Sequence, residues 1–127
     1  MAHLTTAAGM ARWNLGLMNC RETEPGLFTG ASLFDGAQGW VRITPAAGLD
    51  AVDYHVGASP DRLVPRIYAR VIDGALLGHG AGSCVVTLLA WRPAGMSDER
   101  WNRLVSTHET EIELIRAQLN GQQAAPR

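Results

Sequence analysis

The chain has 127 residues, 46% of them hydrophobic, so it is long enough and apolar enough to bury one core without disulfides or metal. Eleven basic residues, all Arg, against twelve acidic ones give a net charge of -1, which lacks the basic excess of a nucleic-acid binder. The spacing of Cys20 and Cys84 fits neither a disulfide framework nor a metal-binding pair. The sequence shows no export signal and no run of ~18 apolar residues. We therefore expect one cytoplasmic domain over residues 1–127 that does not bind membranes.

Residues 1–17 carry an ambiguous pattern. Residues 1–10 permit a short helix that Gly9 weakens. From Ala11 to Leu17 every second residue is apolar, as in a strand, whereas Met10, Trp13 and Leu17 share one helical face. We favour a helix that gives way to a strand near Leu17.

Short reversals between apolar segments predict an antiparallel meander of about six strands. Glu24-Pro25-Gly26 places Pro and Gly at the centre of a type II turn, and Asp35-Gly36 and Ala47-Gly48 are further turn signals. Pro65 must lie at the start of a strand or on an edge, because it cannot donate to a ladder. The predicted strands begin with a hairpin over 19–34, whose returning strand is 27–34, and continue with 39–45, 51–57, 64–73 and 84–91.

Alternation along the middle strands predicts two different sheet faces. We expect the covered face to carry Val41, Ile43, Val52, Tyr54, Val56, Ile67, Ala69 and Val71. The opposite face is predicted to carry Trp40, Arg42, Asp53, His55, Arg66, Tyr68 and Arg70, a mixture suited to water or a partner. On that face Arg42, Asp53 and Arg66 are candidate cross-strand neighbours.

One long helix follows the last strand. Ser97 stands at the N-cap, acidic residues fill the first turn, and Gly121 lies beyond the last apolar position, so residues 120–127 are predicted to form a flexible tail. One apolar stripe runs along the helix and has His108 in its empty place. The stripe consists of Trp101, Leu104, Val105, Ile112, Ile115 and Leu119.

This order of elements resembles the helix-grip fold of the START/Bet v 1-like (SRPBCC) superfamily, in particular its bacterial polyketide cyclase/dehydrase-like branch. The resemblance rests on the hairpin 19–34, the meander 39–73, the strand ending Leu88-Leu89-Ala90-Trp91 and the helix from Met96. It implies an α+β domain whose curved sheet wraps the helix and encloses a cavity, with activities from lipid and hormone binding to polyketide cyclisation, and it implies no cofactor or universal catalytic residue. Only Thr5–Leu17 is available for the N-terminal strand and helix of the family, so an open sheet edge and a homodimer are expected.

The candidate cavity residues are Tyr54, His108, Trp91 and Trp101. His108 and Tyr54 are each read first as core residues, and otherwise as the polar end of a cavity. Trp91 and Trp101 flank the corner between strand and helix, as core or at the cavity mouth. We predict no metal site, because His108-Glu109-Thr110-Glu111-Ile112 lacks the second His of a zincin helix and Asp53 and His55 lack a third ligand.

The sequence therefore predicts a domain that binds a small hydrophobic or aromatic molecule and leaves open whether it also transforms it. The alternative is a non-catalytic interaction module, a homodimer or a chaperone-associated domain, that uses the Arg-rich outer sheet face. A third reading, an NTF2-like enzyme, ranks lower, because that fold places its helices before the sheet and this chain ends in one.

Overall fold

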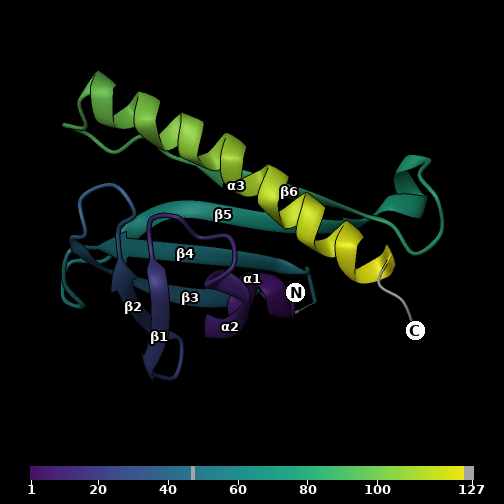
Figure 1. Ribbon diagram of the computed structural model, residues 1–127, viewed down its shortest axis with the longest axis horizontal. Helices are drawn as coiled ribbons and strands as arrows, with labels where there is room; N and C mark the ends of the chain where they lie inside the picture. The colour runs from purple at the N-terminus through teal and green to yellow at the C-terminus, as the bar shows by residue number, and fades with distance from the viewer. Residues whose placement is uncertain (47, 125–127) are drawn as a thin grey trace.

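Six antiparallel strands follow one another in chain order to form an open sheet, and one long helix crosses it (Figure 1). This computed structural model describes residues 1–46 and 48–124. The strands are β1 (Met18–Glu24), β2 (Leu27–Ala31), β3 (Gln38–Ala46), β4 (Ala51–Gly57), β5 (Val64–Asp73) and β6 (Cys84–Ala90). The helices are α1 (Ala2–Thr5), α2 (Ala7–Met10), the 3-10 helix η1 (Gly74–Leu77) and α3 (Asp98–Ala124).

The α+β class, the six-stranded antiparallel order and the long final helix are confirmed. The strand predicted over residues 27–34 is shorter in the structure, where β2 ends at Ala31 and not at Phe34. There the backbone turns: the amide of Gly36 donates to Ser32 O and the amide of Ser32 to Ala37 O, each at 2.9 Å. Among the described residues, no helix is long and apolar enough to cross a membrane.

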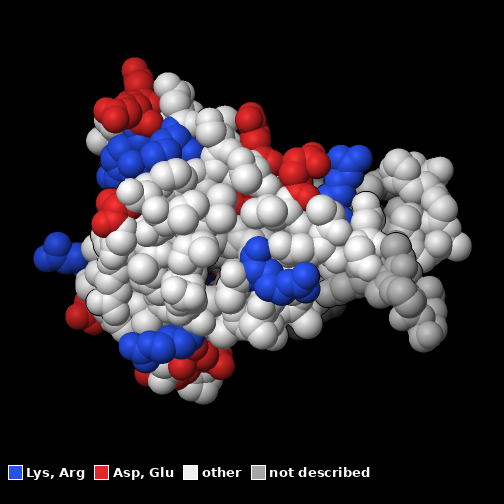
Figure 2. All heavy atoms as spheres, viewed as in Figure 1, with Lys and Arg blue, Asp and Glu red and all other residues white. Residues whose placement is uncertain are grey.

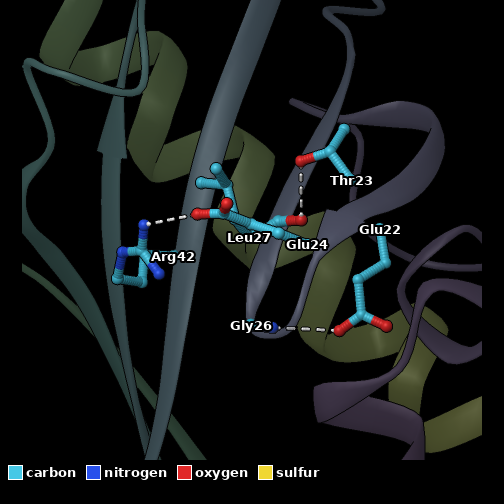
Figure 3. A network of polar contacts seen from close by, with 6 residues as sticks. All are labelled: Glu22, Thr23, Glu24, Gly26, Leu27 and Arg42. Atoms are coloured by element: carbon cyan, nitrogen blue, oxygen red, sulfur yellow. Dashed lines mark hydrogen bonds and ion pairs between the residues drawn. The ribbon is translucent and has the colours of Figure 1, made fainter.

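Figure 3 shows the turn that joins β1 to β2. Gly26 has φ 80°, the left-handed conformation that a type II turn requires at this position. The Glu22 carboxylate accepts from the Gly26 amide at 3.0 Å, and Glu24 forms an ion pair with Arg42 at 3.4 Å. Pro25-Gly26 thus forms the predicted turn, with Glu22 bonded to the turn itself and Glu24 paired with β3.

The inner face of the sheet is apolar, as the alternation predicts. Registers of Val41 with Val56, Ile43 with Tyr54 and Val52 with Ala69 place these side chains side by side. All eight predicted residues belong to the hydrophobic core or pack against it. On β6, Val86 and Leu88 lie opposite Val71 and Ala69, pack against the core and extend this face to the edge of the sheet.

The N-terminal segment covers part of that face. Met10, Trp13 and Leu17 are all buried, and residues 11–17 form turns. The predicted change to a strand near Leu17 is confirmed, because β1 begins at Met18, although the helix already ends at Met10. The Tyr54 hydroxyl donates to Leu4 O at 2.6 Å, and the Trp13 indole NH donates to His3 O at 2.8 Å. These hydrogen bonds help to hold residues 1–17 against the inner face of the sheet.

Helix α3 begins where its capping residue predicts. Ser97 Oγ accepts from the Arg100 amide at 3.2 Å, and acidic residues occupy the first turn. The helix continues through Gly121 to Ala124, so the predicted end at Gly121 is wrong. The flexibility predicted for residues 120–127 stays a prediction. Gly121 does not adopt a left-handed conformation, and a glycine within a helix costs only about 1 kcal/mol. Residues 125–127 of that predicted tail lie outside the described residues.

The buried face of α3 is rotated away from the apolar stripe. Thr107, Glu111 and Ile115 are its most buried residues, although the first two are polar. Val105, which belongs to the stripe, is 39% exposed. The stripe therefore lies only partly against the sheet, and its exposed part lies over β6. Among the described residues, the outer edge of β6 pairs with no strand.

The outer face of the sheet carries mixed charges in local pairs. Arg42 lies opposite His55, and Asp53 lies opposite Tyr68, so the predicted grouping of Arg42, Asp53 and Arg66 is wrong. Asp53 instead pairs with His55 on its own strand at 3.0 Å. Figure 2, viewed from the side on which α3 lies, shows that the opposite side of the molecule also carries small groups of both signs on a largely uncharged surface.

Candidate ligand-binding site

A cavity of about 140 Å³ lies between α3 and the inner face of the sheet. Its walls are mostly apolar, and a group of titratable side chains lies among them. The strands contribute Gly39, Val41, Tyr54, Val56, Arg66, Ile67 and Leu88; the N-terminal segment contributes Trp13, Asn14, Gly16 and Leu17; and α3 contributes Leu104, Thr107, His108 and Glu111.

A β-bulge places Arg66 in this cavity. Tyr54 pairs with Ile67 and His55 pairs with Pro65, which leaves Arg66 as an extra residue between them. Strict alternation predicts Arg66 on the outer face, but it lines the cavity together with Ile67. Its pKa is lowered by burial and by the positive charge of Arg100. The prediction of an outward Arg66 is wrong, because the bulge breaks the two-residue period on which it rests.

Glu111 is the most buried acidic group of the site. Its side chain is 6% exposed, and Oε2 accepts from the Leu15 amide at 2.9 Å, which ties the N-terminal segment to α3. Burial raises its pKa to about 7, against the smaller opposing effect of the Leu15 hydrogen bond. Glu111 thus exchanges a proton near neutral pH.

His108 lies one helical turn before Glu111 on the same face. Its side chain is 13% exposed, and Nε2 is 3.8 Å from Oε1 of Glu111. Burial lowers its pKa, and the positive charge of Arg66 lowers it further. The imidazole is therefore neutral at pH 7 and is available as a hydrogen-bond donor or acceptor toward the cavity.

Tyr54 contributes its ring to the cavity wall but not its hydroxyl to the polar end. The hydroxyl is bonded to Leu4 O, and the ring packs edge-on against Trp13 with centroids 6.5 Å apart. Burial raises the pKa of Tyr54, and the negative charge of Glu111 raises it further.

The two tryptophans proposed for the cavity mouth lie outside the cavity wall. Trp91 is 45% exposed, and its amide donates to Arg66 O at 2.9 Å, next to the bulge. Trp101 is half-buried and lines a separate groove with Ala90 and Val105 on the flank of α3. The rotation of the helix turns Trp101 away from the cavity and brings Glu111 into it.

The sequence does contain signals for the residues that were missed. Glu111 follows His108 by three positions, which places both on one helix face. Pro65 has no amide hydrogen to donate to the ladder, and prolines within sheets occur at strand starts, edges and bulges, which is a signal for the irregular pairing next to Arg66. Neither signal predicts burial, because burial depends on the rotation of α3 and on the N-terminal segment.

The other candidate clusters have structural roles. The Asp53–His55 pair lies half-exposed on the outer face, and the described residues contain no group of three His, Cys, Asp or Glu side chains placed to hold a metal ion. The glycine-rich segment after β5 forms η1 and turns, in which the Gly74 amide donates to Ser83 O at 2.9 Å.

The fold and the cavity together define an α+β domain with a mostly apolar pocket between the sheet and the terminal helix. Comparison of the sequence with protein-family models and with curated proteins finds no match.

Proposed function

We propose that the chain is a helix-grip domain that binds a small hydrophobic or aromatic molecule in the cavity beneath α3. The observation that carries the proposal is the mostly apolar cavity in which Arg66, His108 and Glu111 come together. A few convergent polar groups in an otherwise apolar pocket are typical of small-molecule sites. Buried titratable groups are costly to a fold, so their concentration in one cavity favours a functional role.

The cavity size limits the ligand. At about 140 Å³ it is smaller than the few hundred Å³ of most drug-sized sites. An apolar cavity of roughly 150 Å³ accepts benzene in an engineered protein, so a single ring or a short chain is the size that fits here. A multi-ring polyketide requires the helix to move outward.

An enzymatic form of this proposal is similar to the polyketide cyclase/dehydrase-like branch. In it, Glu111, with its pKa raised to about 7, takes or gives a proton, and neutral His108 orients the reacting group. Both side chains line the same cavity, which is the geometric requirement for such a step.

The test fills the cavity and measures binding. Leu104→Trp replaces a lining residue of α3 with a larger one, and Val105→Trp makes the same change one position away, outside the cavity wall. Calorimetric titration with toluene, phenol and hexanol is expected to show binding to the wild type and to Val105→Trp, and none to folded Leu104→Trp. Equal binding by both variants, or no binding by the wild type, would contradict the proposal.

A second candidate function, homodimerisation, is favoured by the edge of the sheet. β6 contains no charged residue, and its free edge lies beneath the exposed stripe side of α3, whereas β1 at the other edge carries charges and register shifts. Natural edge strands are commonly protected by charges and bulges, so β1 is protected and β6 is not. Antiparallel pairing of two β6 strands about a two-fold axis satisfies both edges. The outer face is less suited, because Arg66 is not on it and Arg42 is paired with Glu24.

A further inference from the structure

Arg66 brings a positive charge into the cavity without a counter-charge. In the part of the chain that the structure describes, no carboxylate oxygen lies within 4.0 Å of its guanidinium. Its Nε is buried and has no hydrogen-bond partner there. Besides burial, the positive charge of Arg100 lowers the pKa of Arg66.

The one acid in the cavity wall does not neutralise Arg66. Glu111 accepts a hydrogen bond from the Leu15 amide through Oε2, and its Oε1 faces His108. Its raised pKa leaves it about half protonated at neutral pH. Arg66 is half-buried, with its Nε fully buried, and among the described residues it has no negative partner within 4.0 Å.

We propose that the ligand is a small monocarboxylic acid, bound as its carboxylate by Arg66 with its hydrocarbon part among the apolar cavity walls. This inference rests on the proposed binding function and names the ligand class. A planar guanidinium presents its donors in a fork that matches the two oxygens of a carboxylate. The Nε donor, buried and unpartnered, belongs to that fork.

The alternatives fit the site less well. An uncharged ligand removes water from Arg66 and supplies no compensating charge, which is costly in an apolar environment. A phosphate monoester carries up to two negative charges, and its tetrahedral head occupies more of a cavity of about 140 Å³. A carboxylate carries one negative charge, which balances that of Arg66, and its planar head group takes up less of the cavity than a phosphate.

The experiment compares acids with their uncharged amides on the full chain. Calorimetric titrations at pH 7.5 use benzoate against benzamide and hexanoate against hexanamide, with toluene as a purely apolar probe. We expect the acid of at least one pair to bind about tenfold or more tightly than its amide, the difference that a charge-assisted hydrogen-bond pair contributes. This ratio is measured on the wild type and needs no variant.

Two variants assign the preference to Arg66. Arg66→Met removes the charge in the cavity, and Arg70→Met removes an arginine of the same strand whose Nε is also buried without a partner but which is predicted on the outer face. We expect Arg66→Met to lose the acid preference while it still binds toluene, and Arg70→Met to behave as the wild type. If Arg66→Met does not fold, Arg66→Gln or the wild-type ratio decides.

The outcomes separate the two proposals. Amides and toluene that bind as well as the acids, or an acid preference that survives Arg66→Met, overturn the carboxylate inference and leave the cavity as a binding site. No binding of any probe overturns the proposed function and this inference together.

Discussion

Nε2 of His108 and Oε1 of Glu111 lie 3.8 Å apart on the inward face of α3, and burial acts on both groups against their charged forms. It lowers the pKa of the imidazole and raises that of the carboxyl to about 7. The pair at neutral pH is therefore a neutral imidazole beside a partly protonated carboxyl, and not a fixed ion pair.

The first prediction concerns Glu111 and pH. Its pKa is about 7 in the folded chain against the ordinary 4.5, so the folded state retains a proton that the unfolded state loses. The stability due to this group is fully present below pH 4.5 and is lost as pH rises through 7, by about 3 kcal/mol at most. Glu111→Gln removes this titration and keeps an oxygen acceptor for Leu15.

The measurement is the free energy of unfolding of wild type and Glu111→Gln between pH 4.5 and 8. We expect the stability of the wild type relative to the variant to fall over that window. Glu113→Gln, on the exposed side of the same helix, is the matched control. A pH-independent difference between wild type and Glu111→Gln would show that Glu111 is not buried as described.

The second prediction concerns His108. Its lowered pKa means that the unfolded state takes up a proton first, so the wild type loses stability as pH falls below about 6.5. His108→Leu removes that loss and a partly desolvated imidazole. We therefore expect the melting temperature to be preserved at pH 7 and raised at pH 5.5, with weaker binding of the ligand. Destabilisation with unchanged affinity per folded molecule would instead assign His108 to a core network.

The third prediction concerns Tyr54. Tyr54→Phe removes the hydroxyl that donates to Leu4 O and leaves a buried carbonyl without its donor. We expect a loss of about 1–3 kcal/mol in urea unfolding and no change in ligand affinity per folded molecule. Tyr68→Phe, half-buried on the outer face, is the control. A loss of affinity without a loss of stability would place the hydroxyl in the ligand site.

The fourth prediction concerns β6. Thr87→Lys adds a charge to the edge strand β6, which pairs only with β5. Thr44→Lys adds a charge to β3, which lies between β2 and β4 in the sheet. If β6 joins two copies, sedimentation at micromolar concentration should show a dimer for wild type and Thr44→Lys and a monomer for Thr87→Lys. A monomeric wild type would remove the homodimer from consideration.

Local chemistry was sufficient for most of the fold. The Pro25-Gly26 turn, the alternation through β4 and along β5 from Ile67 onward, and the Ser97 cap each depend on neighbouring residues, and each appears as predicted. The ends of two elements were predicted wrongly, because β2 ends earlier than predicted and α3 continues past Gly121. At both places weak local preferences compete, and the surrounding chain decides between them.

By itself, the sequence determined the order of the elements, the apolar face of the sheet and the position of His108 on the helix, because hydrophobic periodicity is a local property. Only the tertiary structure decided that Arg66 enters the cavity and that Glu111 is buried. The first depends on one extra residue in the pairing of β4 with β5, and the second on the rotation of α3 against an N-terminal segment more than ninety residues away in the chain. Hydrophobic periodicity predicts neither contact, because it depends on residues that are close together in the sequence.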